Sequence, residues 1–350
     1  MKVKYYRNIF LDSEVNQIGT TSQIVKANFP SSVFSIRNGE RMRMILTSFE
    51  ARRNWYAINE TNNTFYWFDP AGAGTYFPIV IAKGNYEYFD GAPAGFTDLK
   101  TALSTAVNAV AQLAGSTVSY DQTTRKFSID TTGGAGPAVG GYFVCFQVKL
   151  NEPDAPANVS EDGYFNDSNE VLGAVPTRDD WTVPRNAFGT TTGAAVHITP
   201  YVASLNTLEA IYIRTNLHSG NYQTYGFERD LPNEKGLTPT NILARIPLTR
   251  AYFDKEFEFV SFEDPNSLFS MELTQTQLSQ VSFTITDDKG RLIPQVADGQ
   301  AKDGNLNFKM TLRWEVVDME TDLDAYKTLI QNLQPKYNSL AMNGKPLGGA

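Results

Sequence analysis

Nine residues late in the chain read Phe308-Lys309-Met310-Thr311-Leu312-Arg313-Trp314-Glu315-Val316, so every second side chain is apolar. A shorter stretch, Val281-Ser282-Phe283-Thr284-Ile285-Thr286, alternates in the same way. A period of two predicts a β-strand that buries one face and leaves the other face in water. Trp314 is therefore expected in a core, while Arg313 and Glu315 point away from it.

Turn chemistry lies between the two stretches, in Asp287-Asp288-Lys289-Gly290. An aspartate can hydrogen-bond its own backbone, and a glycine accepts a positive φ without strain. The two strands are therefore expected to be joined by this turn within an antiparallel β-sandwich or jelly roll. Proteins with such a fold more often bind ligands or build assemblies than catalyse reactions.

The rest of the chain is also expected to be mainly β. A run with helical spacing begins after Thr97, the expected N-cap, and has Asp98 in its first turn; Gly115 follows it. The expected order begins with an arm at 1–20, a β-rich domain at 21–131 with one helix at 98–114, and a glycine-rich linker at 132–141. A C-terminal jelly-roll-like domain at 142–318 follows, with a polar insertion at 151–192. Residues 319–350 are expected to form a short helix, at 322–333, and a tail.

Composition excludes several classes of function. The 350 residues carry a net charge of −8 and only 19% charged side chains. Direct nucleic-acid binding is not expected, because contact with phosphates needs clustered Lys and Arg. No apolar run approaches the about 20 residues of a membrane-spanning helix, and the opening residues lack the apolar core of a secretion signal. We therefore expect a protein without a membrane span that is made in the cytosol.

Residues for catalysis are scarce. The chain has two histidines, His197 and His218, and one cysteine, Cys145, which sits in a strand pattern and is expected to be a buried structural thiol. These residues do not show the spacing of a zinc site or a catalytic triad. We expect no catalytic residues, no cofactor and no metal requirement. The chain is not expected to be an enzyme.

One loop offers weak candidates for a calcium site. Asp162, Asp167 and Glu170 crowd a short polar stretch, and carboxylate oxygens are the ligands that calcium prefers. The order of these residues is not that of an EF-hand loop. A solvated loop is therefore the favoured interpretation.

Sugar chemistry is a further alternative. Asp179-Asp180 and Glu263-Asp264 could supply the two carboxylates of a glycosidase if the fold brought them together. Trp55 and Trp67 could stack on sugars, although aromatic residues of this kind more often pack in cores or across hairpins. A carbohydrate-binding or adhesin-like β-sandwich remains an alternative from another class.

Three parts of the chain resemble structural proteins of tailless icosahedral double-stranded DNA viruses, such as polinton-like viruses, virophages and large algal viruses. The resemblance rests on Asn54–Tyr66 with the helix that follows it, on Ile211–Leu217 with Asn241–Leu248, and on the closing stretch Ser282–Trp314. Within these viruses, the chain is similar to the penton and minor capsid proteins. The insertion at 151–192 lies outside the resemblance.

The resemblance implies a non-enzymatic capsid component of the penton or minor capsid type. An alternative within the class is a major capsid protein with two jelly rolls. The implied partners are other capsid subunits, with homo-oligomers among them, and the implied location is the virion, assembled inside the host cell. The opening arm would then cross to an adjacent subunit, or else lie along its own domain as an edge strand.

Overall fold

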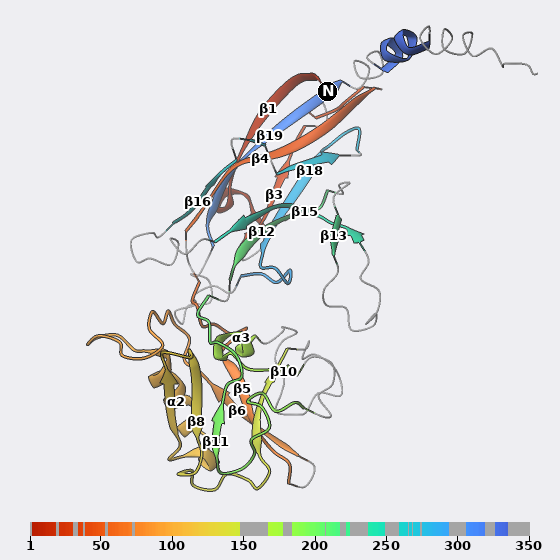
Figure 1. Cartoon of the computed structure of the whole chain (residues 1–350). Helices are drawn as coiled ribbons and strands as arrows, with labels where there is room; N and C mark the ends of the chain where they lie inside the picture. Colours follow the sequence, from red (N-terminus) through yellow and green to blue (C-terminus); the bar gives the residue numbers. More distant parts are fainter. Residues whose placement is uncertain are drawn as a thin grey trace, which may run out of the picture. The chain divides into compact units, whose positions relative to one another are not determined.

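The structure is a computed structural model of the chain (Figure 1). It describes residues 2–18, 21–30, 34–37, 39–52, 55–71, 74–147, 167–177, 184–206, 208–217, 222–224, 237–248, 259–264, 266–267, 269–273, 275–293, 306–318 and 326–334. The described residues are mainly β-strand, as the sequence predicts.

The chain forms two compact units that are interleaved in sequence. The first, the jelly-roll unit, comprises Met1–Arg53, Ile211–Thr286 and Leu306–Ala350. The second, the inserted unit, comprises Asn54–Ala210 and Asp287–Asn305. The inserted unit therefore occupies two breaks in the sequence of the jelly-roll unit.

Two five-stranded sheets build the jelly-roll unit (Figure 1). The first sheet contains β1 (Lys2–Asp12), β4 (Glu40–Arg52), β16 (Phe259–Glu263), β17 (Ser270–Leu273) and β19 (Phe308–Asp318). The second contains β2 (Gln17–Ile18), β3 (Thr21–Asn28), β12 (Ala210–Thr215), β15 (Ile242–Pro247) and β18 (Gln280–Thr286). A separate pair joins β13 (Tyr222–Thr224) to β14 (Leu237–Pro239).

The order of the strands is that of a jelly roll. The first sheet runs β1-β19-β4-β16 and the second runs β15-β12-β18-β3, with β2 beyond β3 and β17 paired to β4. Along the chain, the strands β1, β4, β16 and β19 of the first sheet are separated by strands of the second sheet: first β3, then β12 with β15, then β18. Eight strands wound in this way between two sheets define the jelly-roll architecture. The expectation of a mainly β chain with an antiparallel sandwich is confirmed, but this sandwich also contains the first 53 residues, which the sequence analysis placed outside it.

Along most of β19, buried side chains alternate with more exposed ones, as the sequence predicts. Trp314 is 1% exposed and packs its ring 4.7 Å from that of Phe34, whereas the side chain of Arg313 is 36% exposed. Glu315 differs from the expectation, because it lies on the outer face and is still buried. Arg43 covers it, with Nη2 of Arg43 2.5 Å from Oε2 of Glu315.

The expected link between the last two long strands is wrong. β18 pairs with β3 and β12, whereas β19 pairs with β1 and β4 in the other sheet. The turn residues after β18 instead open a segment, Asp287–Asn305, that belongs to the inserted unit. Alternation identifies a strand and its buried face, but it does not identify the neighbouring strand.

The opening residues do not form a separate arm. β1 pairs antiparallel with β19 from Lys2 to Asp12, and the short helix α1 (Ser13–Asn16) follows it. Ser13 is fully buried, and its Oγ accepts a hydrogen bond from the backbone N–H of Phe308 at 2.8 Å. The first strand is thus an edge strand of its own unit, which is the second of the two arrangements considered for it.

The inserted unit has two small sheets and short helices. One sheet contains β5 (Thr64–Asp69), β6 (Thr75–Val80), β9 (Tyr142–Phe146) and β10 (Pro176–Thr177). The other contains β7 (Thr117–Asp121), β8 (Lys126–Asp130) and β11 (Val196–Ile198). The helices are α2 (Leu99–Asn108), the 3-10 turn η1 (Ala111–Leu113) and α3 (Ser168–Leu172). β10 runs parallel to β9, and the other pairs are antiparallel.

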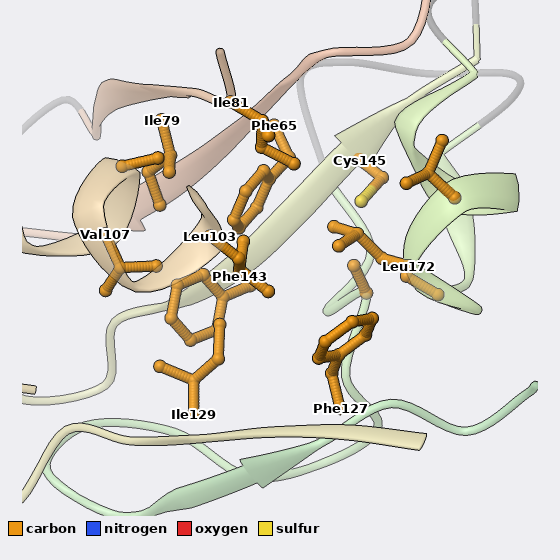
Figure 2. Packing of buried hydrophobic residues seen from close by; sticks show 14 of the residues in the cluster. Phe65, Ile79, Ile81, Leu103, Val107, Phe127, Ile129, Phe143, Cys145 and Leu172 are labelled. Atoms are coloured by element: carbon orange, nitrogen blue, oxygen red, sulfur yellow. The ribbon is translucent and has the colours of Figure 1, made fainter. Parts of the chain in front are cut away.

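A large apolar core connects these elements, and a second, smaller cluster contains Tyr66, Tyr76, Val144 and Phe146. Figure 2 shows Leu103 and Val107 of α2 among Phe143 of β9, Ile129 of β8 and Phe65 of β5. All five are 0% exposed. Complete burial of a Leu, Val or Phe side chain stabilises a fold by about 1.5–3 kcal/mol relative to its exposure. Packing of α2 between the sheets therefore supplies much of the stability of this unit.

The helix α2 is shorter than the helix expected at 98–114. Asp98 is its N-cap, because Oδ1 of Asp98 accepts a hydrogen bond from the N–H of Thr101 at 2.7 Å. This role was assigned to Thr97 from the sequence. The helix ends at Asn108, whose Oδ1 accepts a hydrogen bond from the N–H of Gly115 at 2.7 Å. That bond closes the turn where the sequence predicts continued helix.

The expected domain boundaries differ from the observed units. The glycine-rich stretch 132–141 lies within the inserted unit, between β8 and β9. A Cβ on Gly141 would lie 2.5 Å from Cζ2 of Trp67, and a Cβ on Gly133 would lie 2.8 Å from the backbone O of Gly115. These glycines allow close packing of chain segments, and a flexible linker would not require that.

A further helix covers residues 326–334 and is drawn in dark blue in Figure 1. The sequence places this helix at 322–333, of which 322–325 fall outside the described residues. Among the residues that the structure describes, no helix is both long and apolar enough to cross a membrane.

Candidate assembly surface

Two of the three calcium candidates meet in the inserted unit, but they meet cations of the protein itself. Asp167 directly precedes α3, and Glu170 lies within it. Nζ of Lys289 is 2.5 Å from Oδ1 of Asp167 and 3.1 Å from Oε1 of Glu170. The third candidate, Asp162, lies outside the described residues. In the described ranges, His, Cys, Asp and Glu form no group of three suited to hold a metal ion.

Arg291 extends this group of charges. Its Nη2 lies 2.6 Å from Oδ2 of Asp167, and its Nε lies 2.6 Å from Oδ2 of Asp287. The side chains of Asp167, Lys289, Arg291 and Asp287 are each 12% exposed or less. Together with Glu170 we call these residues the buried ion network. The sequence did not reveal it, because Lys289 and Arg291 follow a turn signal and lie over a hundred positions away from Asp167.

Burial controls the electrostatics of the network. Loss of hydration raises the pKa of Asp287 and of Glu170, against the lowering effect of the nearby cations. The pKa of Arg291 is raised, because attraction to Asp167 and Asp287 outweighs its burial. A calcium ion at Asp167 would have to displace both Lys289 and Arg291. The arrangement is therefore that of a structural clamp between α3 and the segment that follows β18.

The histidine and the cysteine described in the structure are core residues. His197 is fully buried with ring contacts to Trp67 and Phe143, and its Nε2 lies 3.0 Å from the carbonyl of Gly193. Burial lowers the pKa of His197 and raises the pKa of Cys145 to about 12. A thiol of that pKa is a poor nucleophile at neutral pH. The second histidine, His218, lies outside the described residues.

Three of the residues considered for sugar chemistry are buried in the structure. Trp55 and Trp67 are 4% and 0% exposed, so neither offers a ring face for stacking. Asp264 is buried, and its Oδ2 accepts a hydrogen bond from the N–H of Phe269 at 2.8 Å. The pair Asp179-Asp180 lies outside the described residues. The buried carboxylate of Asp264 thus serves the backbone of its own segment, and Glu263 beside it is exposed.

The surface best suited to a partner is the edge of the first jelly-roll sheet. Among the described strands β1 is the outermost of that sheet, so one side of its backbone is not paired with any of them. Its side chains on the outer face include Tyr6, which is 54% exposed, and Phe10, which is 76% exposed. We call this strand with its outer side chains the β1 edge. Exposed strand edges add strands from partners, and exposed aromatic side chains are enriched at protein interfaces.

A hollow and a set of charges lie beside the exposed rings. The hollow, of about 300 Å³, is lined by Phe10 and Asp12 of β1, by Ser48 and Glu50 of β4, and by residues of β19 that include Lys309. Further along the same face, the guanidinium carbon of Arg313 lies 4.4 Å from the centre of the Tyr6 ring. The face therefore presents apolar rings beside charges of both signs, as a polar protein–protein interface does.

Comparison with known proteins yields only remote likenesses. No protein-family model matches the chain, and no curated protein matches it. Among solved structures, a crystal structure of the mavirus penton protein aligns with 89% of this chain and 99% of its own, at 12% sequence identity and a TM-score of 0.39. A chain of the Sputnik virophage, solved by cryo-EM, aligns with 92% of this chain and 99% of its own, at 13% identity and a TM-score of 0.37. These values are too low to assign the chain to a family.

Proposed function

We propose that the chain is a non-enzymatic building block of an icosahedral virus capsid, of the penton or minor capsid type. The observation that carries the proposal is the strand order β1-β19-β4-β16 and β15-β12-β18-β3. That order is a jelly roll, and jelly rolls serve as viral capsid domains, lectin domains and cupins. The sequence resemblance to capsid proteins favours the first of these three uses.

The interior of the jelly-roll unit argues against the use as a cupin. A small-molecule or metal site between the sheets needs space and polar ligands. The described interior is instead filled by large apolar side chains, among them Trp314, Phe283 and Met44, each at most 1% exposed. The space between these sheets therefore serves as a core.

A single jelly roll supports the penton or minor capsid type over a double jelly-roll major capsid protein. The second unit has sheets with the orders β10-β9-β5-β6 and β11-β8-β7, and it includes a parallel pair and a packed helix. Neither order repeats the winding of the first unit. The inserted unit would then be an elaboration carried by the shell-forming jelly roll.

The β1 edge supplies a chemically plausible contact between subunits. A neighbouring subunit that covers Phe10 and Tyr6 would bury apolar area at about 25 cal/mol per Å². The charged residues beside these rings would limit pairing with unsuitable strands. In this proposal, the chain functions by burying surface against other capsid subunits, including copies of itself.

The test combines solution mass with electron microscopy of the purified full chain. We expect a defined cyclic oligomer and, under assembly conditions, curved or closed particles. Phe10→Lys should raise the protein concentration needed for assembly at least tenfold. Val139→Lys is the matched control, because Val139 is 97% exposed and lies in the inserted unit. A chain that stays monomeric and binds glycans on an array would contradict the proposal and favour the lectin-like alternative.

A further inference from the structure

Within the buried ion network, an amine and a carboxyl group lie in contact and almost out of reach of water. Nζ of Lys289 is 2.5 Å from Oδ1 of Asp167, and the two side chains are 7% and 4% exposed. Both residues belong to the inserted unit, although 122 positions separate them in the sequence. Cγ of Asp167 is bonded directly to Oδ1, so the amine nitrogen lies next to a carboxyl carbon. Two groups held together in this way can react as if they were at very high concentration.

A third side chain can carry the protons that such a reaction moves. Oε1 of Glu170 lies 3.1 Å from Nζ of Lys289, which is within the reach of a general acid or base. Gln147 links this carboxyl group to the other reactant, because its Nε2 donates to Oδ1 of Asp167 at 3.3 Å and to Oε1 of Glu170 at 3.4 Å. Loss of hydration raises the pKa of Glu170. A carboxyl group of raised pKa is suited to accept and return a proton near neutral pH.

The far oxygen of the Asp167 carboxyl group faces a fixed positive charge. Nη2 of Arg291 lies 2.6 Å from Oδ2 of Asp167, while Nε of Arg291 is held 2.6 Å from Oδ2 of Asp287. When a nitrogen adds to a carboxyl carbon, negative charge develops on one of the oxygens, and a donor already aimed at that oxygen stabilises it. Arg291 is aimed at Oδ2, which leaves Oδ1 as the oxygen that departs.

We propose that Lys289 and Asp167 condense to an amide cross-link within the inserted unit, with Glu170 as the proton carrier. The ammonium group of Lys289 first gives one proton to Oδ1 of Asp167. The lone pair of Nζ then forms the Nζ–Cγ bond, and the electron pair of the Cγ–Oδ1 bond leaves with Oδ1. Glu170 takes a second proton from Nζ and delivers it to Oδ1, which departs as water. The step is balanced by this one water and needs no oxidant, reductant or further reactant.

The charges around the pair favour the product. A buried ion is costly, and the step removes one cation and one anion together. Arg291 keeps its ion pair with Asp287 in the product, and Oδ2 of Asp167 remains as a carbonyl oxygen that accepts its hydrogen bond. The side chain of Glu170 is 40% exposed, so the released water forms at the edge of the network that faces solvent.

The cross-link would close a long loop of the chain. This loop contains strands β12, β15 and β18 of the jelly-roll unit. A covalent closure of this kind restricts the unfolded chain and thereby stabilises the folded one. The inference goes beyond the proposed capsid function, which requires contacts between subunits and no covalent bond within one of them.

The first experiment is mass spectrometry of the intact, denatured full chain. We expect a mass lower than that of the sequence by about 18 Da, which is the mass of one water. Lys289→Arg keeps the positive charge but removes the amine, so it should restore the full mass. Circular dichroism checks that this variant is folded. A wild-type chain with the full mass of its sequence would overturn the inference.

Peptide mapping of the wild-type chain locates the lost water without any substitution. Digestion with trypsin should release one branched peptide that joins Asp167 to Lys289, with no cleavage after Lys289. Lys83 and Glu60 are the control within the same chain, because they form an ion pair at 3.2 Å but their side chains are 50% and 46% exposed. These two residues should be recovered in separate peptides. Loss of water within a single unbranched peptide would indicate a cyclic imide at an aspartate and would overturn the inference.

The last experiment tests the proton carrier with Glu170→Gln, which keeps the shape of the side chain but takes up no proton near neutral pH. General acid–base catalysis contributes about 10²–10⁴-fold to a rate, so the linked chain should appear at least tenfold more slowly after synthesis. Glu60→Gln is the matched control and should link at the wild-type rate. Equal rates for Glu170→Gln and the wild type would overturn the role of Glu170. Particles that form from an unlinked chain would leave the capsid proposal intact.

Discussion

Nη2 of Arg291 lies 2.6 Å from Oδ2 of Asp167, although 124 positions separate the two residues in sequence. Asp167 precedes α3, and Arg291 follows β18 after the chain has returned from the jelly-roll unit. The ion pair thus holds two distant segments of the inserted unit together. Because the pair is buried, its removal has larger consequences than the removal of a surface ion pair.

The substitution Asp167→Asn should destabilise the inserted unit by about 3–5 kcal/mol, because Lys289 and Arg291 would be left as buried cations with too little negative charge. Glu60→Gln is the matched control, since Glu60 forms an exposed ion pair with Lys83, and such pairs contribute at most about 1 kcal/mol. Urea titration followed by pulse labelling of Cys145 checks both variants. Equal midpoints for the two variants would show that the buried ion network is dispensable.

Cys145 should not react with thiol reagents in the native protein at pH 8. It is fully buried, and burial raises its pKa to about 12, so almost no thiolate is present. Labelling should proceed only as the inserted unit opens, and its rate should rise with urea. The measurement is absorbance during reaction with a chromogenic disulfide. Stoichiometric labelling within seconds in the absence of urea would contradict the placement of Cys145 in the core.

The pH dependence of stability should include a contribution from His197. Burial lowers the pKa of this histidine below its ordinary value of 6.5, so the unfolded chain binds the proton more readily than the folded chain does. The stabilisation from the neutral ring is complete above pH 6.5 and is lost as the pH falls through the folded pKa. Glu170 and Asp287 act in the opposite sense, because their raised pKa values favour the folded state as the pH falls.

The contribution of His197 can be isolated with His197→Gln, which keeps the carboxylates but removes the titrating ring. Between pH 7 and pH 5 the wild type should lose stability relative to this variant, by up to about 1.4 kcal/mol for each pH unit below 6.5. Urea titrations of both proteins at each pH provide the comparison. Parallel pH profiles would show that His197 is protonated equally in the folded and unfolded chains.

Two neighbouring positions of β19 should respond very differently to truncation. Trp314→Ala should destabilise the jelly-roll unit by about 3–5 kcal/mol, because it leaves a cavity among Phe34 and its neighbours. Arg313→Ala should cost only about 0.5–1 kcal/mol, since it removes an exposed contact with the ring of Tyr6. Hydrogen exchange of the β4 and β19 amides measures both effects. A larger effect at Arg313 would mean that the register of β19 is shifted by one residue.

Deletion of residues 1–20 should destabilise the jelly-roll unit itself. β1 pairs with β19 over its whole length, with one register shift between Val3 and Tyr5, and Leu11 and Ser13 are buried in this unit. The truncation would expose the edge of β19 and part of the core. We expect a lower unfolding midpoint in circular dichroism and faster hydrogen exchange in β19. A truncated chain with wild-type stability that fails only to assemble would instead indicate an arm that crosses to a neighbour.

Local features could be predicted well from the sequence. The alternation around Trp314 and Phe283 identified two strands and their buried faces, and helical spacing identified α2 and its first turn, although not its end at Asn108. The burial of Cys145 followed from its place in an apolar strand. Each of these features depends on residues close together in the chain, where the periods of strands and helices are set by the backbone.

The sequence by itself thus determined that the chain is mainly β, and it identified the strongly alternating strands and most of their buried faces. Only the tertiary structure decided that β18 and β19 enter different sheets, that the jelly-roll unit is built from three separate stretches of sequence, and that Lys289 and Arg291 meet Asp167. The physical reason is that the entropic cost of closing a loop rises only slowly with its length. Distant segments therefore compete almost equally as partners, and the packing of the whole core selects among them.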